Sequence, residues 1–97
     1  MNDEQLAKCL AQLGNITRLQ IFKLLVKAGK DGLSVGTIQE KLSVPGSTLS
    51  HHITKLISVD LISQKRDGRT LYCIANYEVL DGVMLALKDQ CCVGIVE

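Results

Sequence analysis

Several residue types that define other protein classes are scarce in this chain of 97 residues. It has no tryptophan, one proline and only three aromatic side chains (Phe22, Tyr72 and Tyr77), so its core must be built from aliphatic residues. A chain of this length buries only about 60–65% of the surface that its extended form would expose. Because a small aliphatic core gives little stability alone, a core shared between two copies is favoured.

Long apolar runs are also missing, and none approaches the roughly 18 residues that span a bilayer. The chain begins Met1-Asn2-Asp3-Glu4, which is acidic where a secretory signal is basic. With 46% hydrophobic and 22% charged residues, the composition is that of an ordinary globular protein rather than a disordered one. We therefore expect a single domain over residues 1–97, located in the cytoplasm and without a membrane partner.

The sequence lacks the motifs of common enzymes and of zinc fingers. It contains no C-x-x-C pair, no P-loop, no G-x-G-x-x-G and no nucleophile–base constellation. Its only histidines are the neighbours His51 and His52, which point about 100° apart in a helix and make a poor chelate. No enzyme activity and no finger-type zinc site are expected.

Hydrophobic spacing and turn signals predict a mainly α fold with a small β-hairpin, in the order ααααββα. The turn at residues 43–46 contains Pro45, which cannot continue one helix but suits the start of the next. The Asp67-Gly68 pair is a strong hairpin signal. The pattern therefore predicts a winged helix-turn-helix. The expected helices are about 3–13, a second one capped by Asn15 and followed by a loop at Gly29 and Gly32, then about 35–42, 46–59 and a last one capped by Asn76. The expected strands are 61–64 and 69–74, joined by residues 65–68.

The fourth predicted helix has a polar face suited to the major groove of DNA. Small hydroxyl side chains allow close approach and pair with base edges or phosphates. An ordinary amphipathic surface helix would look similar, but such a helix usually contains acidic residues, and residues 41–59 contain none. The candidate DNA-binding residues on this helix are Ser47, Thr48, Ser50, His51, Thr54 and Lys55.

The predicted hairpin adds Lys65, Arg66 and Arg69 around Gly68, as in a wing that grips backbone phosphates. In isolation this could be a charged, solvated turn, but its position directly after a helix-turn-helix favours DNA binding. Residues 15–72 contain nine Lys or Arg against four Asp or Glu, a net charge of +5, whereas the whole chain carries +1. The near-neutral total is thus a cancellation between a basic middle and acidic ends, and it does not exclude nucleic acid.

Three segments resemble the ArsR/SmtB family of dimeric winged-helix repressors. They are Leu13-Gly14-Asn15-Ile16-Thr17-Arg18-Leu19, Ser47-Thr48-Leu49-Ser50-His51-His52-Ile53 and Arg66-Asp67-Gly68-Arg69-Thr70-Leu71-Tyr72, within a match over about residues 5–92. The resemblance implies a homodimer built mainly from the first and last helices and bound to operator double-stranded DNA. It also implies repression of a stress or resistance operon that an inducer relieves.

The family's best-known inducer sites are missing from this chain. Ser34 and Gly36 stand where two thiols would lie on the third helix, and the last helix has no histidine for a zinc site. Persulfide-responsive relatives pair a cysteine on the second helix with one on the last, and residues 15–28 of this chain contain no cysteine. What remains is Cys91-Cys92, which resembles the vicinal pair of an arsenite-responsive subgroup. The resemblance implies As(III) or Sb(III) as the inducer, and no cofactor is expected for DNA binding itself.

Trivalent arsenic binds thiolates and prefers three, so Cys9 is our candidate for the third ligand, from the same or the partner subunit. Cys9 and Cys91 also fit plain packing at an interface, and Cys73 is expected to pack in the sheet. Two alternatives stay open. The cysteines could form a redox switch, through a disulfide between Cys9 and Cys91 or across the dimer, or the domain could be a protein-interaction module without DNA binding.

Overall fold

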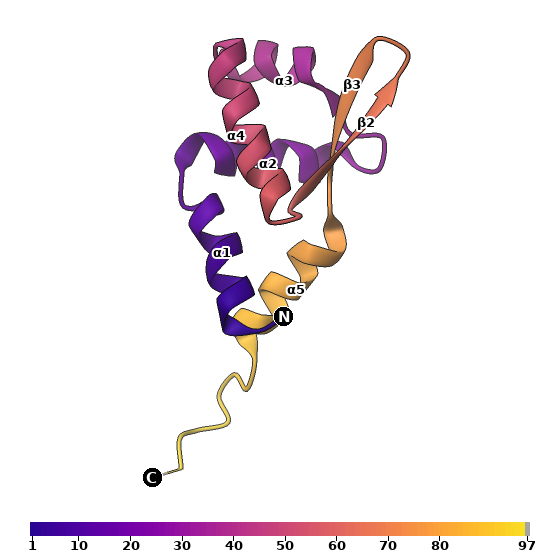
Figure 1. Ribbon diagram of the computed structural model, residues 1–97. Coiled ribbons are helices and arrows are strands. Elements are labelled where there is room, and N and C mark those ends of the chain that lie inside the picture. Colours follow the sequence, from indigo (N-terminus) through magenta and orange to yellow (C-terminus); the bar gives the residue numbers. More distant parts are fainter. Residues whose placement is uncertain (97) are drawn as a thin grey trace.

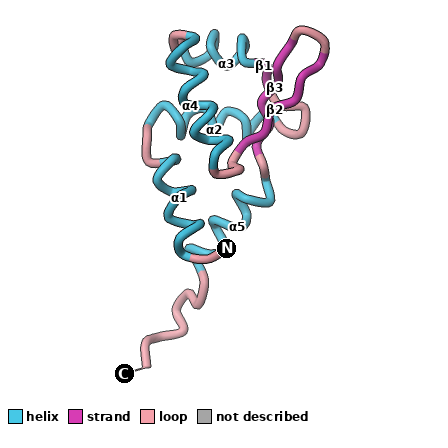
Figure 2. The backbone as a smooth tube through the Cα atoms, viewed as in Figure 1, coloured by secondary structure: helices cyan, strands magenta, loops and turns pink. Residues whose placement is uncertain are grey.

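The computed structural model describes residues 1–96, so Glu97, the end of the predicted domain, lies outside the described part. Figures 1 and 2 show α2, α3, α4 and the sheet in one body, with α1 and α5 extending below it and a tail leading away from α5. Among residues 1–96, no helix has the length and apolar character that crossing a membrane requires. The elements are α1 (Asp3–Leu13), α2 (Ile16–Ala28), β1 (Leu33–Ser34), α3 (Val35–Leu42), α4 (Gly46–Ser58), β2 (Ile62–Asp67), β3 (Thr70–Ala75) and α5 (Tyr77–Lys88).

Side-chain caps determine where most of these helices begin. Asn2 accepts a hydrogen bond from the backbone N–H of Gln5 at 2.8 Å, and the Gln5 side chain accepts one from the Asn2 N–H, which makes a capping box. Asn15, Ser34 and Asn76 cap α2, α3 and α5 in the same general way. The predicted caps at Asn15 and Asn76 are therefore confirmed.

The turn between α3 and α4 brings two helices together as the helix-turn-helix prediction requires. Ser43 ends α3 in the left-handed conformation, with φ of 53°, and Pro45 immediately precedes α4. Leu49, Ile53 and Leu56 of α4 are buried against the rest of the core. Helical spacing predicts an inward face of Leu49, Ile53, Leu56 and Ile57, and the burial of the first three confirms it. The polar residues of α4 therefore face outward.

The wing is a longer hairpin than predicted. β2 pairs antiparallel with β3 from Ile62↔Ala75 to Asp67↔Thr70, so residues 65–67 lie in a strand rather than in the turn. The turn consists of Gly68 and Arg69, and Gly68 has φ of 61°, as a tight two-residue hairpin requires at its first position. The predicted turn at 65–68 is wrong because the strands continue to pair up to the glycine.

The sheet also has a third strand that the sequence does not predict. β1 pairs with β3 through Leu33↔Cys73 and Ser34↔Tyr72, which places β3 at the centre. The loop before β1 lies so close to β3 that a Cβ on Gly32, which has φ of 65°, would overlap the Cys73 carbonyl oxygen. Cys73 itself is fully buried, which confirms its predicted role in sheet packing.

Helical spacing predicts that Leu19, Phe22, Leu24, Leu25 and Val26 form the inward face of α2. Of these, only Phe22 and Leu25 are buried; Ile21 is also fully buried, whereas Leu19 is 36% exposed. The apolar residues of α2 occur all round the helix, so spacing alone does not identify the side that packs inward. Leu19 is left on a surface that α1 and α5 border, where it lines an apolar hollow with Leu13 and Leu80.

Candidate nucleic-acid interface

The outward face of α4 presents the polar side chains that the sequence predicts. Ser47, Thr48, Ser50, His51 and Thr54 are exposed, and Lys55 is half-buried. The Thr54 hydroxyl donates to the Ser50 carbonyl oxygen at 2.9 Å, so its proton is used within the helix. Within residues 1–96, the hydroxyls of Ser47, Thr48 and Ser50 have no hydrogen-bond partner, which leaves them available to base edges or phosphates.

A groove of about 590 Å³ brings this face of α4 together with the wing. Ser50 and Thr54 line it from α4, and Arg66 and Arg69 line it from the hairpin. The start of α3 forms its third side. The groove thus has hydroxyl groups on one wall and guanidinium groups on another. This combination suits the phosphate backbone of DNA, because one guanidinium can donate two parallel hydrogen bonds to two oxygens of a phosphate.

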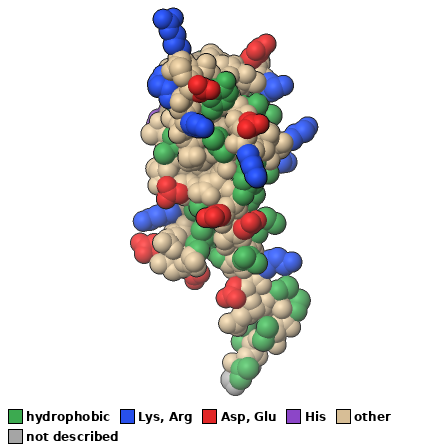
Figure 3. Space-filling model, turned by 90° about the vertical axis from the view of Figure 1, so that its right-hand side faces the viewer, with side chains coloured by type: hydrophobic (Ala, Val, Ile, Leu, Met, Phe, Trp, Pro, Cys, Tyr) green, Lys and Arg blue, Asp and Glu red, His purple; other side chains and the backbone are tan. Residues whose placement is uncertain are grey.

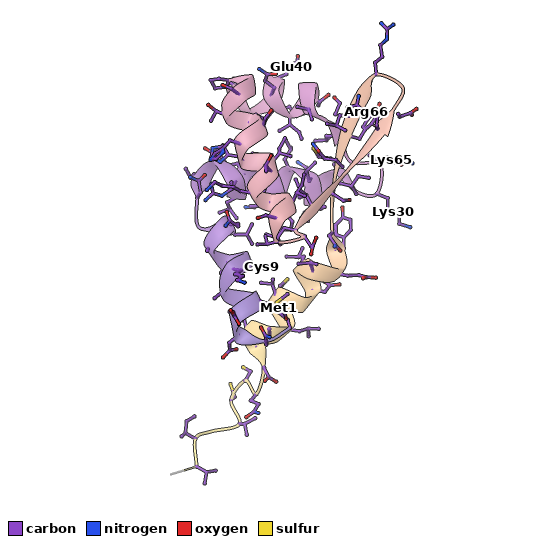
Figure 4. All side chains as sticks on the ribbon, viewed as in Figure 1. Met1, Cys9, Lys30, Glu40, Lys65 and Arg66 are labelled. Atoms are coloured by element: carbon purple, nitrogen blue, oxygen red, sulfur yellow. The ribbon has the colours of Figure 1, made fainter. Side chains whose placement is uncertain are left out.

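The structure divides the three basic residues of the predicted wing between two faces. Side chains alternate along a strand, so Arg66 points with Gln64 toward the groove, while Lys65 points the other way. Lys65 lines a separate hollow of about 270 Å³ with Lys30, Asp31 and Asp67. Figure 4 shows Lys65 and Arg66 on the hairpin and Lys30 on the neighbouring loop. Arg66 and Arg69 are therefore the wing residues that share a surface with α4.

A hydrogen bond that the sequence does not predict supports the flank of α4. Arg18 Nη1 of α2 lies 3.2 Å from His52 Nδ1. Arginine can only donate, so Nδ1 is the acceptor and the proton of the neutral ring is on Nε2. Burial lowers the pKa of His52 first, and Arg18, His51 and Lys55 lower it further. His52 therefore holds α4 against α2, whereas His51 faces outward.

Cys9 differs from the other two predicted ligands, Cys91 and Cys92, because it is buried. It lies on α1 (Figure 4), packs against the end of α4, and its Sγ is 3.8 Å from the Val59 carbonyl oxygen. Burial raises the pKa of the Cys9 thiol, and the nearby Asp60 carboxylate raises it further, which disfavours the thiolate that a soft ion needs.

Cys91 and Cys92 are exposed in the tail after α5, with their sulfur atoms 3.3 Å apart. Among residues 1–96, no three Cys, His, Asp or Glu side chains come together as a possible metal site. The three predicted sulfur ligands are thus not assembled within one chain, and only the vicinal pair is close together.

α1 and α5 contact each other and leave apolar side chains uncovered. Val83 is buried in the core, but on the outer side of α5 Met84 is 55% exposed and Leu87 is 59% exposed, and Leu10 of α1 is also exposed. Figure 3 shows hydrophobic side chains at the surface in the lower part of the molecule, toward the tail. Uncovered apolar side chains on a small domain are characteristic of a face that binds another protein chain.

The helix-turn-helix, the basic hairpin and the polar face of α4 define a winged helix-turn-helix protein. The helix-turn-helix domain family matches residues 13–64. The chain is 29% identical to the arsenical resistance operon repressor of Staphylococcus aureus over 88 residues, 91% of this chain and 82% of that protein. It is 33% identical to the nodulation protein NolR of Rhizobium meliloti over 80 residues, 82% of this chain but only 63% of NolR.

A solved structure supports the same fold. The solution structure of a homodimeric winged helix-turn-helix DNA-binding domain from Mycobacterium bovis, described as a possible ArsR-family transcriptional regulator, has a TM-score of 0.72 to this chain. It is 22% identical, and the match covers 100% of this chain and 96% of that domain. The chain belongs to the ArsR family of winged helix-turn-helix transcriptional regulators.

Proposed function

We propose that this protein is a transcriptional repressor that binds operator double-stranded DNA in the cytoplasm. One observation carries the proposal: the groove that unites Ser50 and Thr54 of α4 with Arg66 and Arg69 of the wing. α4 would read base edges in the major groove, through Ser47, Thr48, Ser50 and His51, while the arginines hold the adjacent backbone.

The functional unit in this proposal is a homodimer formed by α1 and α5. The exposed Leu10, Met84 and Leu87 support it, as does the homodimeric state of the similar mycobacterial domain. A two-fold dimer presents two copies of α4 to successive major grooves, about 34 Å apart, on a near-palindromic site. The small aliphatic core of one chain also gains stability from such an interface.

DNA binding is tested with a duplex selected by the protein from a pool of randomised sequences. The proposal predicts a gel shift whose affinity falls steeply with salt, because each phosphate contact releases a counterion. Failure to select any duplex, or binding that does not change between 50 and 200 mM salt, would contradict it and favour the protein-interaction module.

The inducer in this proposal is a trivalent arsenic or antimony species bound by Cys91 and Cys92. Both cysteines are exposed, and their sulfur atoms lie 3.3 Å apart. One ion can bind both sulfurs at this separation if each bond is about 2.3 Å long, which is the zinc–thiolate bond length. The third thiolate comes from outside the chain, and for Cys9 of the partner subunit to supply it, that buried thiol must first become exposed and lose its proton. Inducer binding beside α5 then changes the relative pose of the two subunits, and the usual size of such coupling is about 5- to 150-fold in affinity.

The inducer is identified by titrating the DNA complex with arsenite, antimonite, zinc, cadmium and peroxide. A Cys91→Ser, Cys92→Ser double variant should bind DNA like the wild type but remain bound in arsenite. Cys9→Ala, compared in parallel, tests the third ligand separately. Normal arsenite release from the double variant would refute the assignment, and release by peroxide alone would identify a thiol redox switch instead.

A further inference from the structure

One side chain connects three helices beside the middle of α4. Arg18, near the start of α2, donates from Nε to the Gln12 carbonyl oxygen at 2.7 Å, close to the end of α1. Its Nη1 donates to His52 Nδ1 on α4 at 3.2 Å. The backbone N–H of Arg18 is held in turn by the capping side chain of Asn15, at 3.0 Å. The guanidinium therefore bridges a helix of the proposed dimer interface and the proposed recognition helix.

We propose that Arg18 is a positioning residue for DNA recognition, which fixes the orientation of α4 relative to α1 through the neutral ring of His52. This inference rests on the proposed DNA-binding function. His52 is half-buried and on the flank of α4, so it acts through the helix rather than at the DNA. His51, its neighbour, is exposed on the recognition face.

The bridge has a chemical requirement that makes it testable. A guanidinium has only donors, so the bond exists only while His52 Nδ1 carries no proton. The basic groups that act on His52 are Arg18 on α2 and His51 and Lys55 on α4, and among residues 1–96 no carboxylate offsets them. Protonation of His52 would place two cations face to face and break the link. Acid should therefore loosen α4.

The test uses the full chain, a duplex that the wild-type protein selects from a randomised pool, and three variants. His52→Asn keeps an acceptor near the Nδ1 position but cannot titrate, whereas His52→Leu removes the acceptor. Arg18→Lys keeps the positive charge but lacks the planar guanidinium that donates to two partners at once. We expect His52→Asn to bind within about twofold of the wild type, and the other two to bind about tenfold more weakly, the usual effect of losing a hydrogen bond to a charged group. Gln20→Ala, an exposed position on α2, is the control and should bind like the wild type.

Two further readouts separate positioning from a general loss of structure. The ratio of wild-type to His52→Asn affinity should fall as the pH is lowered from 7.5 to 5, and His51, present in both proteins, cancels in this ratio. Nitrogen NMR shifts of His52 should show an unprotonated Nδ1 and a protonated Nε2 at neutral pH in the wild type, and a mixture of both tautomers in Arg18→Lys.

Equal binding by all three variants, or an equal loss in His52→Asn and His52→Leu, would overturn the proposal, because the hydrogen bond would then not matter. A protonated Nδ1 in the wild type would overturn it as well. If the wild type selects no duplex at all, the DNA-binding function itself fails. That result is distinguishable from failure of the bridge, which would leave wild-type binding intact.

Discussion

The salt dependence of DNA binding should depend on two arginines of the wing. Arg66 and Arg69 line the groove with α4, so replacing both by glutamine removes four facing cations from a dimer. Each neutralised phosphate contributes about 0.9 to the slope of log affinity against log salt. The double variant should therefore show a slope shallower by about 3.6. Between 50 and 200 mM salt, the wild type should lose about 150-fold more affinity than this variant.

The measurement is fluorescence anisotropy of a labelled, selected duplex at several salt concentrations. Lys8→Gln with Lys88→Gln removes the same charge from α1 and α5, away from the groove, and should leave the slope unchanged. Lys65→Gln should change the slope less than Arg66→Gln, because Lys65 lies on the other face of the wing. An unchanged slope in the Arg66, Arg69 variant, or an equal change in the Lys8, Lys88 variant, would show that these two arginines do not contact phosphates.

Three further perturbations test the fold, the half-buried His52 and the dimer. Gly32→Ala should lower the free energy of unfolding by about 3 kcal/mol, because its Cβ would overlap a carbonyl oxygen of β3, and Gly29→Ala, with open space around it, by about 1 kcal/mol. Chemical denaturation compares the two, and equal losses would contradict the close approach. The folded state lowers the pKa of His52, so its contribution to stability is complete above about pH 6.5 and is lost as the pH falls through the folded-state pKa. Denaturation at several pH values should show this loss in the wild type and less of it in His52→Asn, whereas parallel profiles would contradict it. Met84→Asp with Leu87→Asp should yield monomers by light scattering and weaken DNA binding, and an unchanged dimer mass would exclude this face of α5 as the interface.

Much of the fold follows from local signals in the sequence. Asn15 and Asn76 cap helices where predicted, and Pro45 separates α3 from α4, because these features depend only on neighbouring residues. β1 has only two residues, too few for an alternating pattern, and it becomes a strand only by pairing with β3. The extent of the wing strands is likewise determined by pairing, up to the turn at Gly68.

The candidate interface is partly predictable for the same reason. Helical spacing identifies the polar face of α4, and the period of two in a strand is enough, in principle, to separate Lys65 from Arg66. The bond between Arg18 and His52 joins residues 34 positions apart, and no local pattern indicates it. The burial of Cys9 beneath α4 is also a tertiary effect, which spacing along α1 cannot distinguish from exposure to a partner.

Methylation interference on a selected duplex shows whether α4 enters the major groove. Guanine N7 lies in the major groove, so methylation there blocks a recognition helix but not contacts confined to the minor groove. Interference is expected at two sets of guanines about 10 base pairs apart, centred on the two-fold axis of the site. Binding that N7 methylation leaves unchanged would contradict it.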